Sequence, residues 1–212
     1  MERIFAVGDI HGCFDKLVSL MERIDIDLEK ETLIFIGDYI DRGPGSKEVV
    51  DYLIDLGRRE SRVVFLKGNH ELMLQEYLSG ADRLSFLYNG GGETLASYMK
   101  SDDQHDESNL IPPTHLEFFK NLRLYYETDD YIFVHGGLKP SISLEAQDAW
   151  DMLWIRDDFI RSDFDFGKRV IFGHTPFREP LILDNKIGID TGAVYGNKLT
   201  CVELPALRFV SV

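Results

Sequence analysis

The sequence predicts an α/β fold with parallel strands in its first third and hairpins in its last third. In the first third, short apolar runs alternate with polar loops and amphipathic stretches. Repeated strand–helix units of this kind place strands in parallel with right-handed crossovers. In the last third, apolar runs follow one another across tight polar turns, which favours antiparallel pairs and therefore a mixed sheet.

The first elements follow from hydrophobic periodicity. Continuous apolar runs predict buried strands at Ile4–Val7, Thr32–Ile36 and Val63–Leu66. Each run is followed by a loop rich in Gly, Asp, Asn or His, and then by a helical pattern. The predicted helices are Phe14–Arg23, Ser46–Leu56 and Glu71–Leu78.

The middle of the chain, from Arg83 to Leu122, is predicted to be helical with two interruptions. These are Asn89-Gly90-Gly91-Gly92 and the polar stretch Ser101–Asn109, which we expect to be a mobile surface loop. The later strands are predicted at Arg123–Glu127, Tyr131–Val134, Val170–Phe172, Leu181–Leu183, Lys186–Ile189, Leu199–Leu204 and Leu207–Val210. No internal repeat or linker divides the chain, so a single domain spanning residues 1–212 is expected.

Composition narrows the class of partner. The 212 residues carry a formal net charge of −14. Such an acidic chain is not expected to bind nucleic acid or anionic membranes, because both need clustered Lys and Arg. Cys13 and Cys201 are the only cysteines, and the N-terminus lacks the long apolar region of a signal peptide. These features predict a cytoplasmic location.

Several predicted strands end directly in residues that bind metals. The segments are Gly8-Asp9-Ile10-His11-Gly12, Gly37-Asp38-Tyr39-Ile40-Asp41-Arg42-Gly43, Gly68-Asn69-His70-Glu71, His135-Gly136-Gly137 and Gly173-His174-Thr175. One such segment alone could be an ordinary turn. However, four of the six histidines stand beside Gly or Asn at strand ends, where parallel strands bring their loops together. Imidazole with hard oxygen donors suits manganese, iron or zinc, and a carboxylate can bridge two ions.

These motifs resemble those of the phosphoprotein phosphatase family of metallophosphoesterases. The three-part signature GDxHG, GDxxDRG and GNHE is intact, and the resemblance extends from Arg3 to about Cys201. It is strongest to the small bacterial and phage lambda-type serine/threonine protein phosphatases, through segments such as Leu153-Trp154-Ile155-Arg156 and Ile189-Asp190-Thr191-Gly192. The resemblance implies a four-layer α/β/β/α sandwich with two mixed sheets and an active site at the C-terminal ends of the strands.

The resemblance also implies a role for each motif residue. Asp9 and His11 would bind one divalent ion, Asp38 would bridge two, and the second ion would be completed by Asn69, His135 and His174. Manganese is the expected metal, with iron or zinc as alternatives. His70 would protonate the leaving group while Asp41 orients its imidazole, and Arg42 and Arg156 would bind the phosphoryl oxygens.

Three further residues are open to more than one interpretation. Arg156 could instead pair with the neighbouring Asp157 or Asp158. Asn89 could line the substrate pocket or form a turn before the three glycines. Tyr195 could reach the substrate or pack structurally.

The predicted function is therefore a serine/threonine protein phosphatase in which a metal-activated hydroxide attacks phosphorus in line. The expected substrate is a phosphorylated protein or peptide, and small phosphate esters could also serve. One alternative is a symmetrical dinucleoside tetraphosphate hydrolase, which Gly43-Pro44-Gly45-Ser46 resembles although Asp41 and Glu71 favour the phosphatase. The other is a catalytically silent module that binds phosphorylated partners. Nothing in the sequence indicates an oligomeric state.

Overall fold

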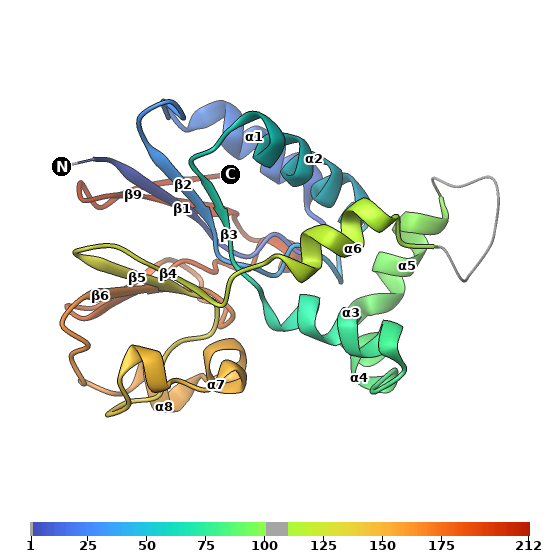
Figure 1. Ribbon diagram of the computed structural model, residues 1–212. Helices are drawn as coiled ribbons and strands as arrows, with labels where there is room; N and C mark the ends of the chain where they lie inside the picture. The colour runs from blue at the N-terminus through green and yellow to red at the C-terminus, as the bar shows by residue number, and fades with distance from the viewer. Residues whose placement is uncertain (1, 101–109) are drawn as a thin grey trace.

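The computed structural model describes residues 2–100 and 110–212 and contains two five-stranded sheets packed face to face (Figure 1). The strand order of the first sheet is β10 (Arg208–Ser211), β9 (Thr200–Leu204), β1 (Ile4–Val7), β2 (Thr32–Phe35) and β3 (Val63–Phe65). The second sheet has the order β4 (Tyr125–Glu127), β5 (Tyr131–Val134), β6 (Arg169–Phe172), β8 (Lys186–Gly188) and β7 (Leu181–Ile182).

Both sheets are mixed. In the first, β1, β2 and β3 pair in parallel, while β9 pairs antiparallel with both β1 and β10. In the second, β5, β6 and β8 run parallel, and the edge strands β4 and β7 pair antiparallel with β5 and β8. The tight polar turns of the last third that make these two edge pairs contain Asp129-Asp130 and Asp184-Asn185, and the mixed sheet predicted from such turns is confirmed.

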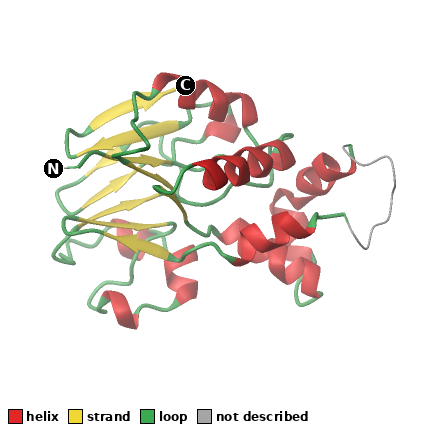
Figure 2. Cartoon of the chain, turned by 45° about the horizontal axis from the view of Figure 1, so that its top comes forward, coloured by secondary structure: helices red, strands yellow, loops and turns green. Residues whose placement is uncertain are grey.

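Helices cover the outer faces of the sandwich (Figures 1 and 2). On the first sheet lie α1 (Phe14–Arg23) and α2 (Ser46–Arg59), and on the second α7 (Ala149–Trp154) and α8 (Asp157–Ile160). A further group of helices extends from one end of the sandwich. It comprises α3 (Asn69–Ser79), α4 (Leu84–Phe86), a π-helical turn (Leu87–Gly91), α5 (Gly92–Met99) and α6 (Pro113–Lys120). The predicted four-layer arrangement is thus observed.

Three apolar clusters hold the layers together. One packs α1 and α2 on the first sheet through residues such as Leu17, Leu53 and Phe35. The second lies between the sheets and joins Ile34 to Phe133 and Ile171. The third packs α7 and α8 on the second sheet. Burial on both faces explains why the parallel strands are continuous apolar runs in the sequence.

Several predicted elements begin or end one to three residues from their observed bounds, and two helices were not predicted. Helix α3 begins at Asn69 rather than Glu71, because the Glu71 carboxylate accepts the Gly68 N–H at 2.8 Å and so closes the first turn two residues earlier. Helices α7 and α8 were not predicted, although Asp148 caps α7 by accepting the Trp150 N–H. The predicted loop Ser101–Asn109 lies outside the described residues. Among the described helices, none is long and apolar enough to cross a membrane.

Candidate active site

The five motif segments meet where the two sheets present the C-terminal ends of their central strands. Asp9 and His11 follow β1, Asp38 follows β2, and His135 and His174 follow β5 and β6. Asn69 and His70 occupy the first turn of α3. The eight predicted ligand and acid–base residues are all buried, with at most 4% of each exposed: Asp9, His11, Asp38, Asp41, Asn69, His70, His135 and His174.

Asp38 lies at the centre of this cluster. Its Oδ2 is 3.4 Å from His11 Nε2 and 3.9 Å from His70 Nε2, while Oδ1 is 3.3 Å from His135 Nε2. Two groups of potential ligand atoms share this carboxylate, one with His11 and His70 and one with His135 and His174. A carboxylate placed between two sets of donors is the geometry of a bridging ligand.

Two of the histidines are oriented by backbone carbonyls. His11 Nδ1 donates to Ile40 O at 2.8 Å, and His135 Nδ1 donates to Ile36 O at 2.9 Å. This bond leaves the Nε2 atom of each ring facing Asp38. Fixing a ring by its far nitrogen is how proteins commonly orient metal-binding histidines.

The backbone of the site is strained. Of the seven non-glycine residues with positive φ in the described chain, five belong to the motif segments: His11, Asp38, Asp41, Arg42 and His174. Left-handed conformations of this kind are uncommon outside glycine and cluster at functional sites. Here they turn the chain sharply off each strand and aim side chains inward.

Two motif glycines allow carboxylates to approach the backbone. A Cβ atom on Gly68 would lie 2.1 Å from Asp38 Oδ1, and one on Gly173 would lie 2.2 Å from Asp9 Oδ1. Any side chain at either position would therefore displace a predicted metal ligand. The glycines of the motifs are thus required by the packing of the acidic groups.

A hydrogen-bonded chain supports His70. Its Nδ1 donates to Asp41 Oδ2 at 2.6 Å, and the hydroxyl of Thr94 on α5 donates to Asp41 Oδ1 at 2.6 Å. The Asp41 N–H donates to Thr94 Oγ1 and to Ser46 Oγ. The predicted contact between Asp41 and His70 is therefore present. Thr94 was not singled out in the sequence, because an isolated hydroxyl residue 53 positions from Asp41 gives no local signal. Ser46 was noted as part of Gly43-Pro44-Gly45-Ser46 and not as a partner of Asp41.

Glu71 supports the loop after β2. Its carboxylate accepts the backbone N–H groups of Asp38 and Tyr39 in addition to that of Gly68. In the sequence, Glu71 was noted only as the first residue of a predicted helix, as the last residue of the GNHE motif and as a feature that favours the phosphatase. The structure shows that it also ties α3 to the segment that carries Asp38.

Burial and mutual charge control the titration of the cluster. Burial raises the pKa of Asp9 well above its usual range, and repulsion from Asp190 adds to the effect. Burial also raises the pKa of Asp190 to about 6. Asp190, to which the sequence assigned no role, accepts the Gly192 N–H at 2.9 Å. Burial alone would lower the pKa of His135, but the carboxylate of Asp38 outweighs it and raises the pKa to about 9.

The other histidines behave differently. Burial lowers the pKa of His174 to about 2, that of His11 to about 3 and that of His70 to about 4. His11 and His174, which are predicted metal ligands, are therefore neutral at physiological pH, and the neutral ring is the form that binds a metal. The proton retained by His135 supplies the positive charge that the surrounding carboxylates require.

The donor set fits divalent cations. Asp9 Oδ1 and His174 Nε2 are buried without a hydrogen-bond partner in the described chain. Buried polar atoms without partners are rare in folded proteins and indicate a missing ligand or ion. Oxygen and imidazole donors converge on the same space, and this combination suits first-row divalent metals.

The predicted substrate-binding residues differ in their exposure and in whether they contact the metal donors. Arg42 donates from Nη1 to His11 Nε2 at 2.6 Å, and its guanidinium lies 5.7 Å from the centre of the exposed Tyr195 ring. Arg156 is exposed and contacts Thr175 Oγ1 at 3.5 Å, whereas Asp157 pairs with Arg161. The Asn89 amide donates back to Ser85 O, which fits a structural role for this side chain.

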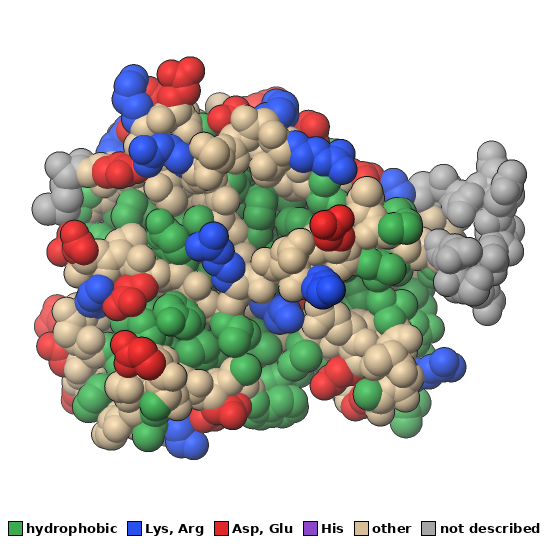
Figure 3. Space-filling model, in the orientation of Figure 1, with side chains coloured by type: hydrophobic (Ala, Val, Ile, Leu, Met, Phe, Trp, Pro, Cys, Tyr) green, Lys and Arg blue, Asp and Glu red, His purple; other side chains and the backbone are tan. Residues whose placement is uncertain are grey.

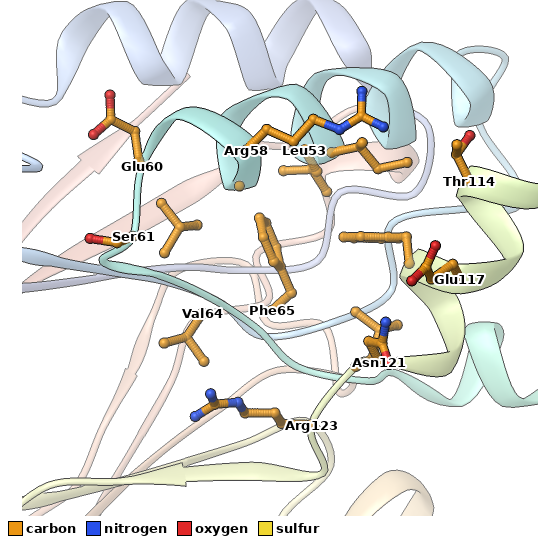
Figure 4. A pocket seen from close by; sticks show the side chains of 15 residues that line it. Leu53, Arg58, Glu60, Ser61, Val64, Phe65, Thr114, Glu117, Asn121 and Arg123 are labelled. Atoms are coloured by element: carbon orange, nitrogen blue, oxygen red, sulfur yellow. The ribbon is translucent and has the colours of Figure 1, made fainter.

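A cavity of about 490 Å³ lies between α2, β3 and α6 and is separate from the candidate active site (Figure 4). Leu53, Phe65, Glu117 and Arg123 are among its lining residues, and none of the predicted site residues lines it. On the face shown in Figure 3, no histidine is visible, and acidic, basic and apolar side chains are interspersed. The burial of the site histidines agrees with this view.

Fold and site together define a metallophosphoesterase, with a two-sheet sandwich and a buried ring of metal donors at its strand ends. A family model of calcineurin-like phosphoesterases matches residues 2–201, and the chain belongs to this family of hydrolases. Over 206 residues it is 30% identical to serine/threonine-protein phosphatase 1 of Salmonella typhimurium, covering 95% of this chain and 91% of that protein.

Other relatives carry a different name. The chain is 28% identical to the asymmetrical bis(5'-nucleosyl)-tetraphosphatase PrpE of Anoxybacillus flavithermus over 230 residues, covering 97% of this chain and 92% of that protein. Among solved structures, a protein serine/threonine phosphatase from Saccharomyces cerevisiae superimposes with a TM-score of 0.67 at 20% identity, covering 100% of this chain and 79% of that chain. This structural likeness shows the shared fold.

Proposed function

We propose that the protein is a metal-dependent phosphomonoesterase that dephosphorylates serine and threonine side chains of proteins. The observation that carries this proposal is the His70–Asp41 pair. His70 Nδ1 is held at 2.6 Å by Asp41, and its Nε2 faces the shared carboxylate of Asp38. The pair therefore has the orientation of an acid that serves a reaction within the ring of metal donors.

In this proposal each predicted ligand keeps its role. Asp9, His11 and Asp38 would hold one ion, and Asp38, Asn69, His135 and His174 the other, with Mn²⁺ preferred over iron or zinc. Two bound dications would neutralise charge on the phosphoryl group and acidify the attacking water. Arg42 and Arg156 would bind the phosphoryl oxygens, because guanidinium groups match them bidentately. These local charges offset the formal net charge of −14.

The leaving group separates the candidate substrates. A serine or threonine alkoxide is a poor leaving group and must be protonated as the P–O bond breaks. His70 would deliver that proton from Nε2 in its imidazolium form, which Asp41, Asp38 and the negative charge of a bound phosphate group favour against the effect of burial. A nucleotide released from a polyphosphate leaves as a stable anion and needs less help. An acid fixed this firmly therefore favours phosphate monoesters of alcohols.

A second candidate is a bis(5'-nucleosyl)-tetraphosphatase, which the names of several relatives favour. Those relatives are named asymmetrical, whereas the sequence suggested a symmetrical enzyme as the alternative. Analysis of the products of diadenosine tetraphosphate distinguishes these two modes of cleavage. Symmetrical cleavage yields two ADP, whereas asymmetrical cleavage yields ATP and AMP. A silent binding module is disfavoured, because every predicted donor is retained and buried.

The test is to compare substrates in wild type and His70→Asn, with metal content measured in the same preparations. We expect the variant to lower kcat for phosphoserine and phosphothreonine peptides by ~10²–10⁴ and to affect diadenosine tetraphosphate far less. His115→Asn is the matched control, because His115 is also buried but contacts Asp51 and Tyr98 instead of the site. Wild-type turnover of phosphoserine peptides by His70→Asn would disprove the acid assignment.

A further inference from the structure

Two tryptophans of α7 extend from the metal cluster to the surface. The Trp154 ring meets His174 edge to face, with centroids 6.0 Å apart and an interplanar angle of 85°. Trp150 stacks on Trp154 at 5.2 Å and 25°, and 58% of Trp150 is exposed. The exposed indole is therefore two ring contacts from a predicted metal ligand. It is held in place by the ring beneath it.

A polar atom without a partner lies within the same arrangement. Trp154 Nε1 is buried and has no hydrogen-bond partner in the described part of the chain. Tyr and Trp normally find a partner for their polar atom when it is buried. The indole that carries this unpaired donor contacts both His174 and Trp150, and a ligand oxygen would satisfy it.

A cation adjoins the aromatic pair. Arg156 follows Trp154 by two residues, and its Nη1 lies 3.5 Å from Oγ1 of Thr175, the residue after the predicted ligand His174. The acidic Asp151 of α7 is paired with Lys139 at 3.3 Å. Phosphate groups passing from the cluster towards Trp150 would thus meet a guanidinium, and the nearby carboxylate is already neutralised.

We propose that Trp150 and Trp154 form a shelf that binds the base of a nucleotide whose phosphates occupy the metal site. Pairwise contacts link the metal donors to Arg156 through Thr175 and to the exposed Trp150 ring through Trp154, which carries the unpaired N–H. A nucleotide offers groups that match these: phosphates, sugar oxygens and a flat base. Bases stack on exposed aromatic rings with about 1–3 kcal/mol each, which corresponds to about 5- to 150-fold in affinity.

A peptide side chain is the competing occupant. A phosphopeptide could place an apolar residue on Trp150, but it offers no flat ring as a constant feature and no obligatory oxygen for Trp154 Nε1. The nucleotide accounts for both observations. The inference rests on the metal site of the proposed function, and it applies whether the nucleotide is a substrate, a product or an inhibitor.

The experiment compares two ligands that differ only in the nucleoside. Calorimetry on the Mn²⁺-loaded protein would measure binding of the methylene-bridged analogue of ATP and of the corresponding methylene-bridged triphosphate. We expect wild type to bind the ATP analogue at least about 5-fold more tightly. Trp150→Ala should bring this ratio close to one, Trp150→Phe should restore most of it, and Leu116→Ala, which removes an exposed apolar side chain from α6, should leave it unchanged.

Tryptophan fluorescence provides a second measurement of base stacking. The chain has two tryptophans, so base stacking on the exposed one should quench a large share of the emission in wild type but not in Trp150→Phe. A wild-type affinity ratio near one, or a ratio unchanged in Trp150→Ala, would overturn the shelf. So would a Trp150→Ala effect confined to phosphopeptides.

Hydrolysis of phosphoserine peptides in the same preparation separates the two proposals. If the protein hydrolyses phosphoserine peptides but binds the ATP analogue no more tightly than the methylene-bridged triphosphate, the shelf is refuted and the phosphatase proposal stands. Binding of the ATP analogue that depends on Trp150, without hydrolysis of phosphoserine peptides, would refute the phosphatase and support the shelf.

Discussion

Replacing Thr94 with valine should weaken both the stability and the catalytic acid of this protein. Thr94 is fully buried, and its hydroxyl donates to Asp41 Oδ1 at 2.6 Å while accepting the Asp41 N–H at 2.8 Å. Valine keeps the shape but removes both bonds. The Asp41 N–H retains Ser46 Oγ at 3.1 Å, whereas Oδ1 loses the only partner that the described structure gives it.

An unsatisfied buried acceptor costs about 1–3 kcal/mol, and more if it is charged. We therefore expect Thr94→Val to lower the free energy of unfolding by about 2–3 kcal/mol in urea denaturation. Loss of the bond that orients Asp41 should also lower kcat for phosphoserine peptides by about tenfold with little change in KM, since His70 acts in the transition state. Thr94→Ser keeps the hydroxyl and should lose no more than about 1.5 kcal/mol. A valine variant with wild-type urea midpoint and kcat would refute this reasoning.

Three other perturbations test the metal cluster and its supports. Asp38→Asn should reduce the metal bound per chain, because it removes the charge that both donor groups share; elemental analysis showing wild-type content would argue against bridging. Metal binding must displace the proton of His135, whose pKa the Asp38 carboxylate raises to about 9 against the effect of burial. Affinity for Mn²⁺ should therefore rise as pH increases from 6.5 to about 9, and calorimetry that finds a flat or falling affinity would contradict the sign. Glu71→Gln should destabilise the fold by about 1–3 kcal/mol, because an amide NH₂ cannot accept the Tyr39 N–H; thermal unfolding at the wild-type temperature would count against this.

The sequence was sufficient to predict that the candidate ligands lie close together, because most of them follow an apolar strand. Asp9, Asp38, His135 and His174 are fixed in space once β1, β2, β5 and β6 are known to be parallel neighbours in two facing sheets. For this reason, the position of the motifs at the ends of predicted parallel strands, together with the family resemblance, predicted the cluster without knowledge of any distance. The bounds of β1, α1 and β5 were also predicted without error, since each is a complete apolar or amphipathic repeat.

The supports of the site could not be predicted in the same way. Thr94 reaches Asp41 from a helix 53 residues away, and Glu71 binds backbone atoms 32 and 33 residues before it. Such contacts depend on the packing of α3 and α5 and leave no periodic pattern. Helix α7 was missed because its six residues are too few to show a clear amphipathic repeat. The stacked tryptophans became visible as a pair only once that helix was placed.

The strained backbone links stability to function. A residue held in the left-handed region costs on the order of 1 kcal/mol or more, and five site residues adopt it. That cost persists only where neighbouring structure fixes the loop. Here Glu71 holds Asp38, Thr94 and Ser46 hold Asp41, and Gly90 O accepts the Arg42 N–H. Because α3, α5 and the π-helical turn supply these bonds, the helical group at the end of the sandwich acts as a brace for the acid–base and phosphate-binding loop.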